Sequence, residues 1–405
     1  MKCGLLGEKL GHSYSPQIHG YLGSYSYQLF EKQPNELGDF LLNGDFHGLN
    51  VTIPYKKAVI PYLAELSPVA ARLGAVNTVV RREDGSLIGH NTDYFGFRTM
   101  VEASGLKVKG KKVLILGSGG ASNTAVAVMQ ELGSQVVVIS RSGENNYGNL
   151  ERHKDAAVIV NTTPVGMYPN VEASPLSLEH FSRLEGVLDL IFNPARTRLL
   201  QQAEARGLVA MNGLLMLVAQ AKESAEWFTG SAIDQELIGS IHQKLQKQIE
   251  NIILIGMPGC GKTSVAAELS RLTGKEVVDA DAEIVAAAGM TIPEIFAQGG
   301  EDAFRKLETT VLQQLGKRSG IILSTGGGCV TRKENYPLLH QNGRIIWLQR
   351  DISALPTDGR PISQKSDLNE LYEIRRPLYK AFADEVIENN GTLADAANQI
   401  LGRSL

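Results

Sequence analysis

Residues 256–263 form the pattern G-x-x-x-x-G-K-T, which is typical of a loop that binds the phosphates of a nucleotide. The apolar run 252–255 precedes this loop, and a helical pattern opens at Ser264. Inward-facing backbone N–H groups and the helix dipole would both favour a phosphate here. We predict that Lys262 reaches the β- and γ-phosphates and that Thr263 binds Mg²⁺. The other cofactor-binding residues predicted in this loop are Gly259, Cys260, Gly261 and Ser264.

A pair of carboxylates follows the loop. The segment 276–281 reads as a strand that ends in D-x-D, with Asp279 and Asp281 two residues apart. Alternate residues of an extended segment face the same side, so both carboxylates can reach one site. One can bind magnesium, directly or through water, and the other can accept a proton from a substrate hydroxyl. Alternatively, one of them caps the next helix.

The first half of the chain carries a different set of polar side chains. Ser13 and Ser15 could donate jointly to one anion, or a serine could instead cap the helix that Pro16 can start. Lys56 lies at the end of a strand, and Asp93 follows an Asn-Thr pair at a turn. A lysine, a carboxylate and several neutral donors are suited to proton transfer on a polyol.

A dinucleotide-binding unit is predicted from Lys112 onward. A strand over 112–116 is followed by a glycine-rich loop, a helix over 123–132 and a second strand over 135–140. An NAD-binding unit would place an acidic residue after the second strand, whereas this chain has Arg141 between two serines. A guanidinium suits a 2′-phosphate and so favours NADP, although Arg141 could also be a solvated turn residue. The predicted cofactor-binding residues are Gly117, Gly119, Gly120, Ala121, Ser140 and Arg141.

Composition excludes several classes of protein. The 405 residues are 43% hydrophobic and 20% charged, as in an ordinary globular protein, and the net charge of −3 favours neither nucleic acid nor an anionic membrane as a partner. We find no apolar run long enough to cross a bilayer and no signal peptide. Three cysteines without C-x-x-C spacing indicate a reducing cytoplasm. The oligomeric state stays open.

These motifs require a scaffold of alternating strands and helices, so we predict the α/β class throughout. We expect a substrate-binding α/β domain over 1–102, completed by helices at about 213–246, and a Rossmann domain over 103–212. A P-loop α/β domain follows over 250–405. Leu237, Ile241, Leu245 and Ile249 are spaced four apart, so the linker between the halves is predicted to be short and partly helical.

The first 245 residues resemble the shikimate dehydrogenase family in S-Y-S-P at 13–16, in the segments 50–56, 74–78 and 91–93, in the glycine loop and in Gln220-Ala221. The resemblance implies that Ser13 and Ser15 bind a substrate carboxylate and that Lys56 and Asp93 are the catalytic pair. Phe192 stands where the family usually has tyrosine, which removes a hydroxyl near that carboxylate. The remaining roles implied are ring-hydroxyl binding by Thr52, Asn77 and Gln220, and cofactor binding by Leu190 and Gly213.

The last 155 residues or so resemble the shikimate kinase family in the phosphate loop, D-x-D, F-R-x-x-E at 304–308, three successive glycines and R-x-P-L-Y at 375–379. The resemblance makes Asp281 the base, which leaves Asp279 for the metal. It also implies a lid arginine, Arg360, although the segment 348–360 looks shorter than is usual for the family. The substrate-binding residues implied are Arg305 and Arg375 for a carboxylate, and Gly326, Gly327 and Gly328 for a ring hydroxyl.

Together the two resemblances predict a bifunctional enzyme of aromatic biosynthesis. Its first half would reduce 3-dehydroshikimate to shikimate with NADPH, and its second half would phosphorylate shikimate with MgATP. Two alternatives stay open. One is an NAD-using quinate/shikimate dehydrogenase fused to a different small-molecule kinase. The other is a metabolite-sensing regulator without catalysis, although the predicted catalytic groups are all present.

Overall fold

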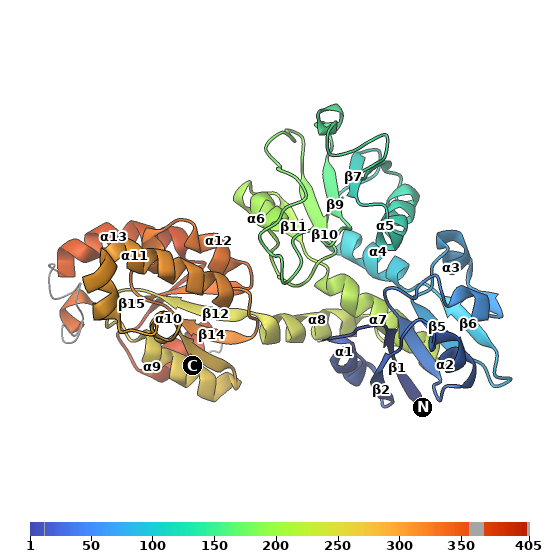
Figure 1. The fold of residues 1–405 in the computed structure, drawn as a ribbon, viewed down its shortest axis with the longest axis horizontal. Coiled ribbons are helices and arrows are strands. Elements are labelled where there is room, and N and C mark those ends of the chain that lie inside the picture. The colour runs from blue at the N-terminus through green and yellow to red at the C-terminus, as the bar shows by residue number, and fades with distance from the viewer. Residues whose placement is uncertain (12, 356–367, 403–405) are drawn as a thin grey trace. The chain divides into compact units, whose positions relative to one another are not determined.

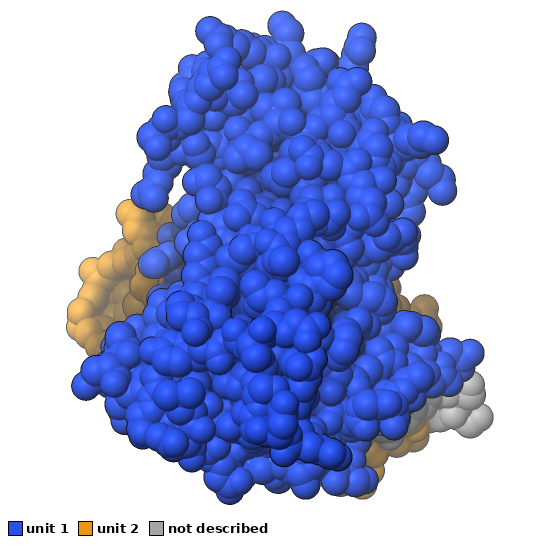
Figure 2. Space-filling view, turned by 90° about the vertical axis from the view of Figure 1, so that its right-hand side faces the viewer, with its two compact units in different colours: residues 1–192, 199–245 blue, residues 193–198, 246–405 orange. Residues whose placement is uncertain are grey.

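The computed structural model describes residues 1–11, 13–355 and 368–402. The chain forms two compact units, coloured separately in Figure 2. Unit 1 comprises Met1–Phe192 and Leu199–Leu245, and unit 2 comprises Asn193–Arg198 and Gln246–Leu405. Three sheets with flanking helices make up these units (Figure 1), so the predicted α/β class is confirmed.

The first sheet of unit 1 is mixed and has the strand order β2-β1-β3-β5-β6-β4. Strand β1 is parallel to β2 and β3, whereas β5 is antiparallel to β3 and β6. Buried side chains such as Leu6, Leu49 and Val79 form the core on this sheet. The strands are β1 (Lys2–Gly7), β2 (Ser26–Glu31), β3 (Gly48–Val51), β4 (Glu65–Leu66), β5 (Thr78–Arg81) and β6 (Leu87–His90).

The helices of this part bring distant segments of the chain together. Helix α7 packs against both α1 and α4, although about 110 residues separate α4 from α7. A Cβ atom at Gly96 would lie only 2.7 Å from the Met216 carbonyl oxygen, so a glycine permits this close packing of α4 on α7. The helices are α1 (Ser15–Leu22), α2 (Leu37–Asn43), α3 (Pro68–Leu73), α4 (Asp93–Ala103), α7 (Leu214–Thr229) and α8 (Glu236–Ile249).

The second sheet of unit 1 is entirely parallel, with the order β11-β10-β9-β7-β8. Apolar clusters cover both of its faces, as continuous apolar strands require. The strand order reverses at β7, which is where open α/β sheets bind their ligands. The elements are β7 (Lys112–Leu116), β8 (Gln135–Ile139), β9 (Val158–Asn161), β10 (Gly186–Asp189) and β11 (Val209–Met211), with helices α5 (Gly120–Glu131) and α6 (Arg198–Ala205).

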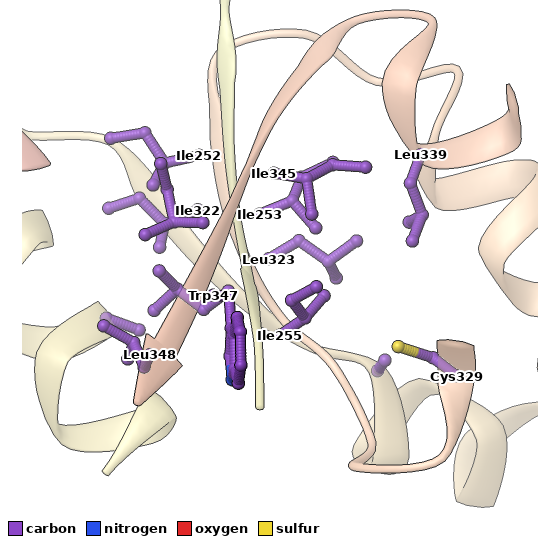
Figure 3. Close-up of a cluster of buried hydrophobic side chains, with 14 of the residues drawn as sticks. Ile252, Ile253, Ile255, Ile322, Leu323, Cys329, Leu339, Ile345, Trp347 and Leu348 are labelled. Atoms are coloured by element: carbon purple, nitrogen blue, oxygen red, sulfur yellow. The ribbon is translucent and has the colours of Figure 1, made fainter. Parts of the chain in front are cut away.

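Unit 2 contains a five-stranded parallel sheet with the order β13-β14-β12-β15-β16. Strand β12 is central and wholly buried, and its neighbours supply much of the core in Figure 3. Helix α8 ends one residue before β12, as the spacing of its apolar residues predicts. The strands are β12 (Asn251–Ile255), β13 (Glu276–Asp279), β14 (Ile321–Ser324), β15 (Gly343–Gln349) and β16 (Glu385–Glu388). The helices are α9 (Lys262–Thr273), α10 (Ala280–Ala288), α11 (Ile292–Leu315), α12 (Asn335–His340), α13 (Leu368–Phe382) and α14 (Leu393–Ile400).

Candidate active sites

The phosphate loop joins β12 directly to α9. Gly256, Gly259 and Gly261 have φ values of +144°, +84° and +97°, which side chains other than glycine rarely adopt. A Cβ atom at Gly256 would also lie 2.5 Å from the Leu348 carbonyl oxygen at the end of β15. The loop therefore turns tightly over the carboxyl edge of the sheet, next to the N-terminus of α9.

The side chains of this loop occupy defined positions. The ammonium group of Lys262, which is 8% exposed, donates to the carbonyl oxygens of Gly256 and Met257 at 3.0 Å each. The hydroxyl of Thr263 lies 3.5 Å from that of Ser324 at the end of β14. Cys260 is fully buried and its amide donates to the Met257 carbonyl, so it lies beneath the loop. Ser264 lies in the first turn of α9, which begins two residues earlier than predicted.

A cavity of about 800 Å³ extends from the phosphate loop. The cavity brings a region that can hold phosphates together with side chains that are suited to binding a small polar acid. The lining includes predicted site residues from five segments: Gly259, Gly261, Lys262, Thr263, Ser264, Asp279, Asp281, Arg305, Gly326, Gly327, Gly328 and Arg375.

Asp279 and Asp281 differ in their local roles. Strand β13 ends at Asp279, not at Asp281 as predicted, and Asp281 lies in the first turn of α10. The side chain of Asp279 caps α10 by accepting from the amides of Asp281 and Ala282 at 3.0 and 3.2 Å. Both carboxylates nevertheless line the cavity. The capping alternative therefore applies to Asp279, which can still offer its second oxygen to a metal.

Arg305 and Glu308 form a buried ion pair rather than the surface pair that their spacing alone suggests. Arg305 Nη1 donates to Glu308 Oε2 at 2.8 Å, and the two side chains are 7% and 1% exposed. Burial raises the pKa of Glu308, a shift that the charge of Arg305 opposes. Glu308 also lines the cavity and was missed as a site residue. The motif F-R-x-x-E at 304–308 could have indicated Glu308, because an arginine directed into a buried site needs a partner of opposite charge.

Each of the three successive glycines touches a different part of the cavity. A Cβ atom at Gly326 would lie 2.9 Å from Asp281 Oδ1, and one at Gly328 would lie 2.1 Å from Arg305 Nη2. The carbonyl oxygen of Gly327 accepts from Arg375 Nη1 at 3.2 Å and from the Tyr379 hydroxyl at 2.5 Å. The absence of side chains thus lets this loop lie against the predicted base and both predicted carboxylate-binding arginines.

The segment 348–360, which is predicted to include the lid arginine, contains two arginines. Arg360 lies outside the described residues. Arg350, directly after β15, lines the cavity and was not predicted as a site residue. Its position directly after an apolar strand, at the carboxyl edge of the sheet, was the sequence signal for it.

In unit 1, Lys56 and Asp93 meet although 37 residues separate them. Lys56 Nζ donates to Asp93 Oδ2 at 2.5 Å, and the side chains are 28% and 17% exposed. Asp93 is the first residue of α4, where the helix dipole favours a carboxylate. Thr52 directly follows β3, four residues before Lys56, and its amide donates to the Leu6 carbonyl. An ammonium group and a carboxylate in direct contact can pass and stabilise a proton.

Asn77 and Gln220 lie next to this pair and are almost completely buried. Asn77 Oδ1 accepts from the amide of Thr92, the neighbour of Asp93, at 2.7 Å. Asn77 Nδ2 lies 3.5 Å from Gln220 Oε1. A Cβ atom at Gly96 would lie 2.9 Å from that of Gln220, so this glycine sets how closely the glutamine approaches α4. Gly96 was not predicted as a site residue.

Ser13 and Ser15 lie at the start of α1. The Ser13 hydroxyl accepts from the Ser15 amide at 3.2 Å, and Ser15 is the first residue of the helix. The N-cap is Tyr14, without a side-chain cap, so the interpretation of a capping serine is wrong. The ring of Tyr14 lies 5.9 Å from that of Phe192, which brings the two serines near the position that lacks a hydroxyl.

The predicted dinucleotide site lies at the carboxyl ends of β7 and β8. Gly117 has a φ value of +108°, and its carbonyl oxygen accepts from the Ser122 hydroxyl at 2.7 Å. Helix α5 begins at Gly120, three residues earlier than predicted, which places Gly120 and Ala121 in its first turn and Gly119 at the N-cap. Ser140 and the exposed Arg141 directly follow β8, and a Cβ atom at Gly213 would lie 2.1 Å from the Leu190 carbonyl oxygen.

Comparison with known proteins agrees with this geometry. The family model for the shikimate dehydrogenase substrate binding domain matches residues 5–79, and the model for shikimate kinase matches residues 258–404. A "Shikimate dehydrogenase (NADP(+))" of Clostridium perfringens is 34% identical over 265 residues, which cover 60% of this chain and 97% of that protein. The chain belongs to the shikimate dehydrogenase family. It also carries a shikimate kinase domain, so both predicted families are confirmed.

Solved structures of shikimate dehydrogenases share the fold of this part of the chain. Shikimate dehydrogenase 1 of Peptoclostridium difficile is 38% identical with a TM-score of 0.56, and it covers 60% of this chain and 97% of its own. A chorismate mutase/shikimate 5-dehydrogenase fusion protein of Clostridium acetobutylicum is 35% identical with a TM-score of 0.58, over 61% and 97% of the two chains. The chain described here is a bifunctional shikimate-pathway enzyme in which a shikimate dehydrogenase is followed by a kinase. In the part that the structure describes, no helix has the length and apolar character needed to cross a membrane.

Proposed function

We propose that this enzyme reduces 3-dehydroshikimate to shikimate with NADPH and then transfers the γ-phosphoryl group of ATP to the 3-hydroxyl of shikimate. The observation that carries the proposal is the cavity of unit 2, which joins a phosphate loop to two buried arginines. These are the groups needed for a phosphoryl donor and for an acceptor with a carboxylate. We assign substrate binding in the reductase to residues 1–102 with 213–246, NADPH to 103–212, and the kinase reaction to 250–405.

In the reductase, bound NADPH supplies a hydride to the ring carbonyl. Lys56 donates the proton that turns the carbonyl oxygen into a hydroxyl, and Asp93 holds the ammonium group in place from 2.5 Å. Ser13 and Ser15 bind the substrate carboxylate. Thr52, Asn77 and Gln220 bind the ring hydroxyls that do not react.

The choice of NADPH follows from the residues that directly follow β8. Arg141 is exposed and flanked by two serines, and no acidic residue stands between them to bind a ribose 2′-hydroxyl. The glycine-rich turn after β7 and the N-terminus of α5 fit a pyrophosphate, because a positive φ at Gly117 lets the backbone turn toward it. The related enzyme of Clostridium perfringens is named for NADP(+), which supports the same choice.

In the kinase, MgATP supplies the phosphoryl group, and catalysis is chiefly positioning and neutralisation of charge. Thr263 and Asp279 are suited to the metal, and Lys262 to the phosphates. Asp281 orients the attacking hydroxyl and accepts its proton. Arg305 and Arg375 bind the carboxylate while Gly326, Gly327 and Gly328 hold a ring hydroxyl, and Arg360 meets the transferred group.

A coupled assay with 3-dehydroshikimate, NADPH and ATP tests both halves. We expect oxidation of NADPH and formation of shikimate 3-phosphate, with shikimate as the intermediate. Lys56→Ala should lower the reductase kcat by about 10²–10⁴ and leave phosphorylation of added shikimate unchanged.

Asp281→Asn should give the reverse pattern, because it keeps the shape of the side chain and removes the base. Shikimate should then accumulate at an unchanged rate of NADPH oxidation, while ATP binding survives. An intact chain that consumes NADPH without forming any phosphorylated product would refute the kinase half of the proposal.

A further inference from the structure

The two buried arginines of the unit 2 cavity have different surroundings. Arg305 forms ion pairs with Glu308 and Glu301. Arg375 is 4% exposed, and no described carboxylate of unit 2 forms an ion pair with it. A buried cation still needs polar groups around it, because the loss of its hydration is costly. Within the described part of unit 2, neutral groups therefore fix the direction of Arg375.

One of these neutral groups is the carbonyl oxygen of Gly327. Arg375 Nη1 donates to it at 3.2 Å, and the Tyr379 hydroxyl donates to it at 2.5 Å. A carbonyl oxygen has two lone pairs, so these two hydrogen bonds use its capacity as an acceptor. The bond from Tyr379 is the shorter one, and it sets the direction of the carbonyl group that holds the arginine.

Tyr379 is itself held firmly. It lies four residues after Arg375 in α13, on the same face of the helix, and is completely buried. Its ring stacks on that of Trp347 with 5.7 Å between the ring centroids, and its hydroxyl lies 3.8 Å from Met257 Sδ. Burial raises the pKa of the Tyr379 hydroxyl, and the charge of Arg375 opposes this rise. The hydroxyl thus keeps its one proton, which it donates to the Gly327 carbonyl.

The backbone at Gly327 is confined from another side by the phosphate loop. A Cβ atom at Gly327 would lie 2.8 Å from Pro258 Cδ and 3.2 Å from the Pro258 nitrogen. The carbonyl group consequently has little room to turn toward a different donor. Without the Tyr379 hydroxyl, its free lone pair would draw the guanidinium of Arg375 toward it, because an unmade hydrogen bond is costly.

We propose that Tyr379 is a positioning residue of the kinase, which fixes the direction in which Arg375 presents its guanidinium to the substrate carboxylate. The guanidinium is planar and rigid, so a bond from one of its five N–H donors to Gly327 fixes the plane of the others. Those others are left for the carboxylate. Tyr379 is absent from the described lining of the cavity and acts through Arg375. This inference rests on the proposed kinase activity of unit 2.

The test compares two acceptors of the phosphoryl group in the full chain, with ADP release measured at saturating ATP. One is shikimate, and the other is its carboxamide, in which an NH₂ group replaces one carboxylate oxygen and removes the charge. The parental enzyme should prefer the acid by about tenfold or more in kcat/KM, because charge-assisted hydrogen bonds are lost with the amide. Tyr379→Phe, which keeps the ring, should reduce this ratio by about threefold to tenfold through a higher KM for shikimate. The KM for ATP should not change.

Tyr372→Phe is the matched control on the same helix. Its hydroxyl accepts from Gln349 Nε2 at 3.0 Å, away from Gly327 and Arg375, so this variant should keep the parental ratio. In an Arg375→Ala background, Tyr379→Phe should lower the ratio little further, because the group that it positions is gone. Equal losses on the acid and the amide in Tyr379→Phe would assign the tyrosine a merely structural role and overturn the proposal.

The remaining outcomes separate this inference from the proposed function. If Tyr379→Phe does not fold, Trp347→Phe decides, because a smaller ring loosens Tyr379 and keeps its hydroxyl. A lower ratio in Trp347→Phe supports the positioning role, and a parental ratio overturns it. An active parental chain with the same ratio in Tyr379→Phe refutes the positioning alone. A parental chain that phosphorylates no shikimate, or that accepts acid and amide equally, refutes the proposed kinase site, and the role of Tyr379 falls with it.

Discussion

Gly328→Ala should weaken the binding of shikimate to unit 2 and spare the binding of ATP. The backbone at Gly328 has φ −104° and ψ 3°, which alanine can adopt, so the substitution introduces no backbone strain. Its Cβ atom, however, would lie 2.1 Å from Arg305 Nη2 and 2.4 Å from Arg305 Cζ. The guanidinium of Arg305 must therefore move, because it ends a side chain, whereas the added Cβ atom is fixed to the backbone of the glycine loop.

The magnitude follows from what the guanidinium loses. Arg305 is held by Glu308 at 2.8 Å and by Glu301 at 3.2 Å, and its displacement removes it from the position in which we propose that it binds the substrate carboxylate. A hydrogen bond to a charged group contributes about 1.5–3 kcal/mol, and about 1.4 kcal/mol corresponds to a tenfold change in affinity. The KM for shikimate should rise about tenfold to a hundredfold, measured by ADP release at saturating ATP.

A double-mutant cycle makes this reasoning refutable. Once Arg305→Ala has removed the guanidinium, the added methyl group of Gly328→Ala has nothing to displace and should cost little more. Gly239→Ala in α8, whose Cβ atom would meet nothing within 4 Å, is the control and should leave the KM unchanged. A parental KM in Gly328→Ala, or effects that add fully in the double variant, would show that Arg305 does not bind the substrate.

Three further outcomes are expected. Arg141→Ala should raise the KM for NADPH about tenfold to a hundredfold and leave that for NADH nearly unchanged, whereas equal losses would make the arginine structural. Gly96→Ala should lower reductase kcat/KM by roughly tenfold or more and spare the kinase, because a Cβ atom 2.7 Å from the Met216 carbonyl forces α7 and Gln220 away from α4. Burial lowers the pKa of His90 from 6.5 to about 4, so the unfolded chain binds a proton in that range that native unit 1 does not. The free energy of unfolding of unit 1, measured by chemical denaturation, should therefore fall as the pH drops from 6.5 to 4, and His90→Phe should reduce this slope.

Local patterns in the sequence were sufficient for the fold class, the two families and the strands and helices that flank the glycine-rich loop and the phosphate loop. The phosphate loop was recognisable because strand, glycines and helix are neighbours in the chain, and their spacing alone dictates the turn. The strand at 112–116 and the helices at 214–229 and 236–249 were evident from apolar periodicity, which burial on one or both faces imposes. The ends of elements were harder to predict, as at Asp279, because a strand or helix ends where its tertiary partners end.

The tertiary structure decided how these groups meet. The sequence placed Arg305 and Glu308 one turn apart on a helix, but only the packing of α11 against the rest of unit 2 buries the pair, and burial raises the pKa of Glu308. Likewise, Asn50 and Ser224 are 174 residues apart and neither belongs to a motif that marks a buried contact. Hydrogen bonds of this kind depend on the distances in space between segments that lie far apart in the sequence of unit 1. No periodicity or spacing within either segment records those distances, which is why these buried hydrogen bonds became visible only in the folded chain.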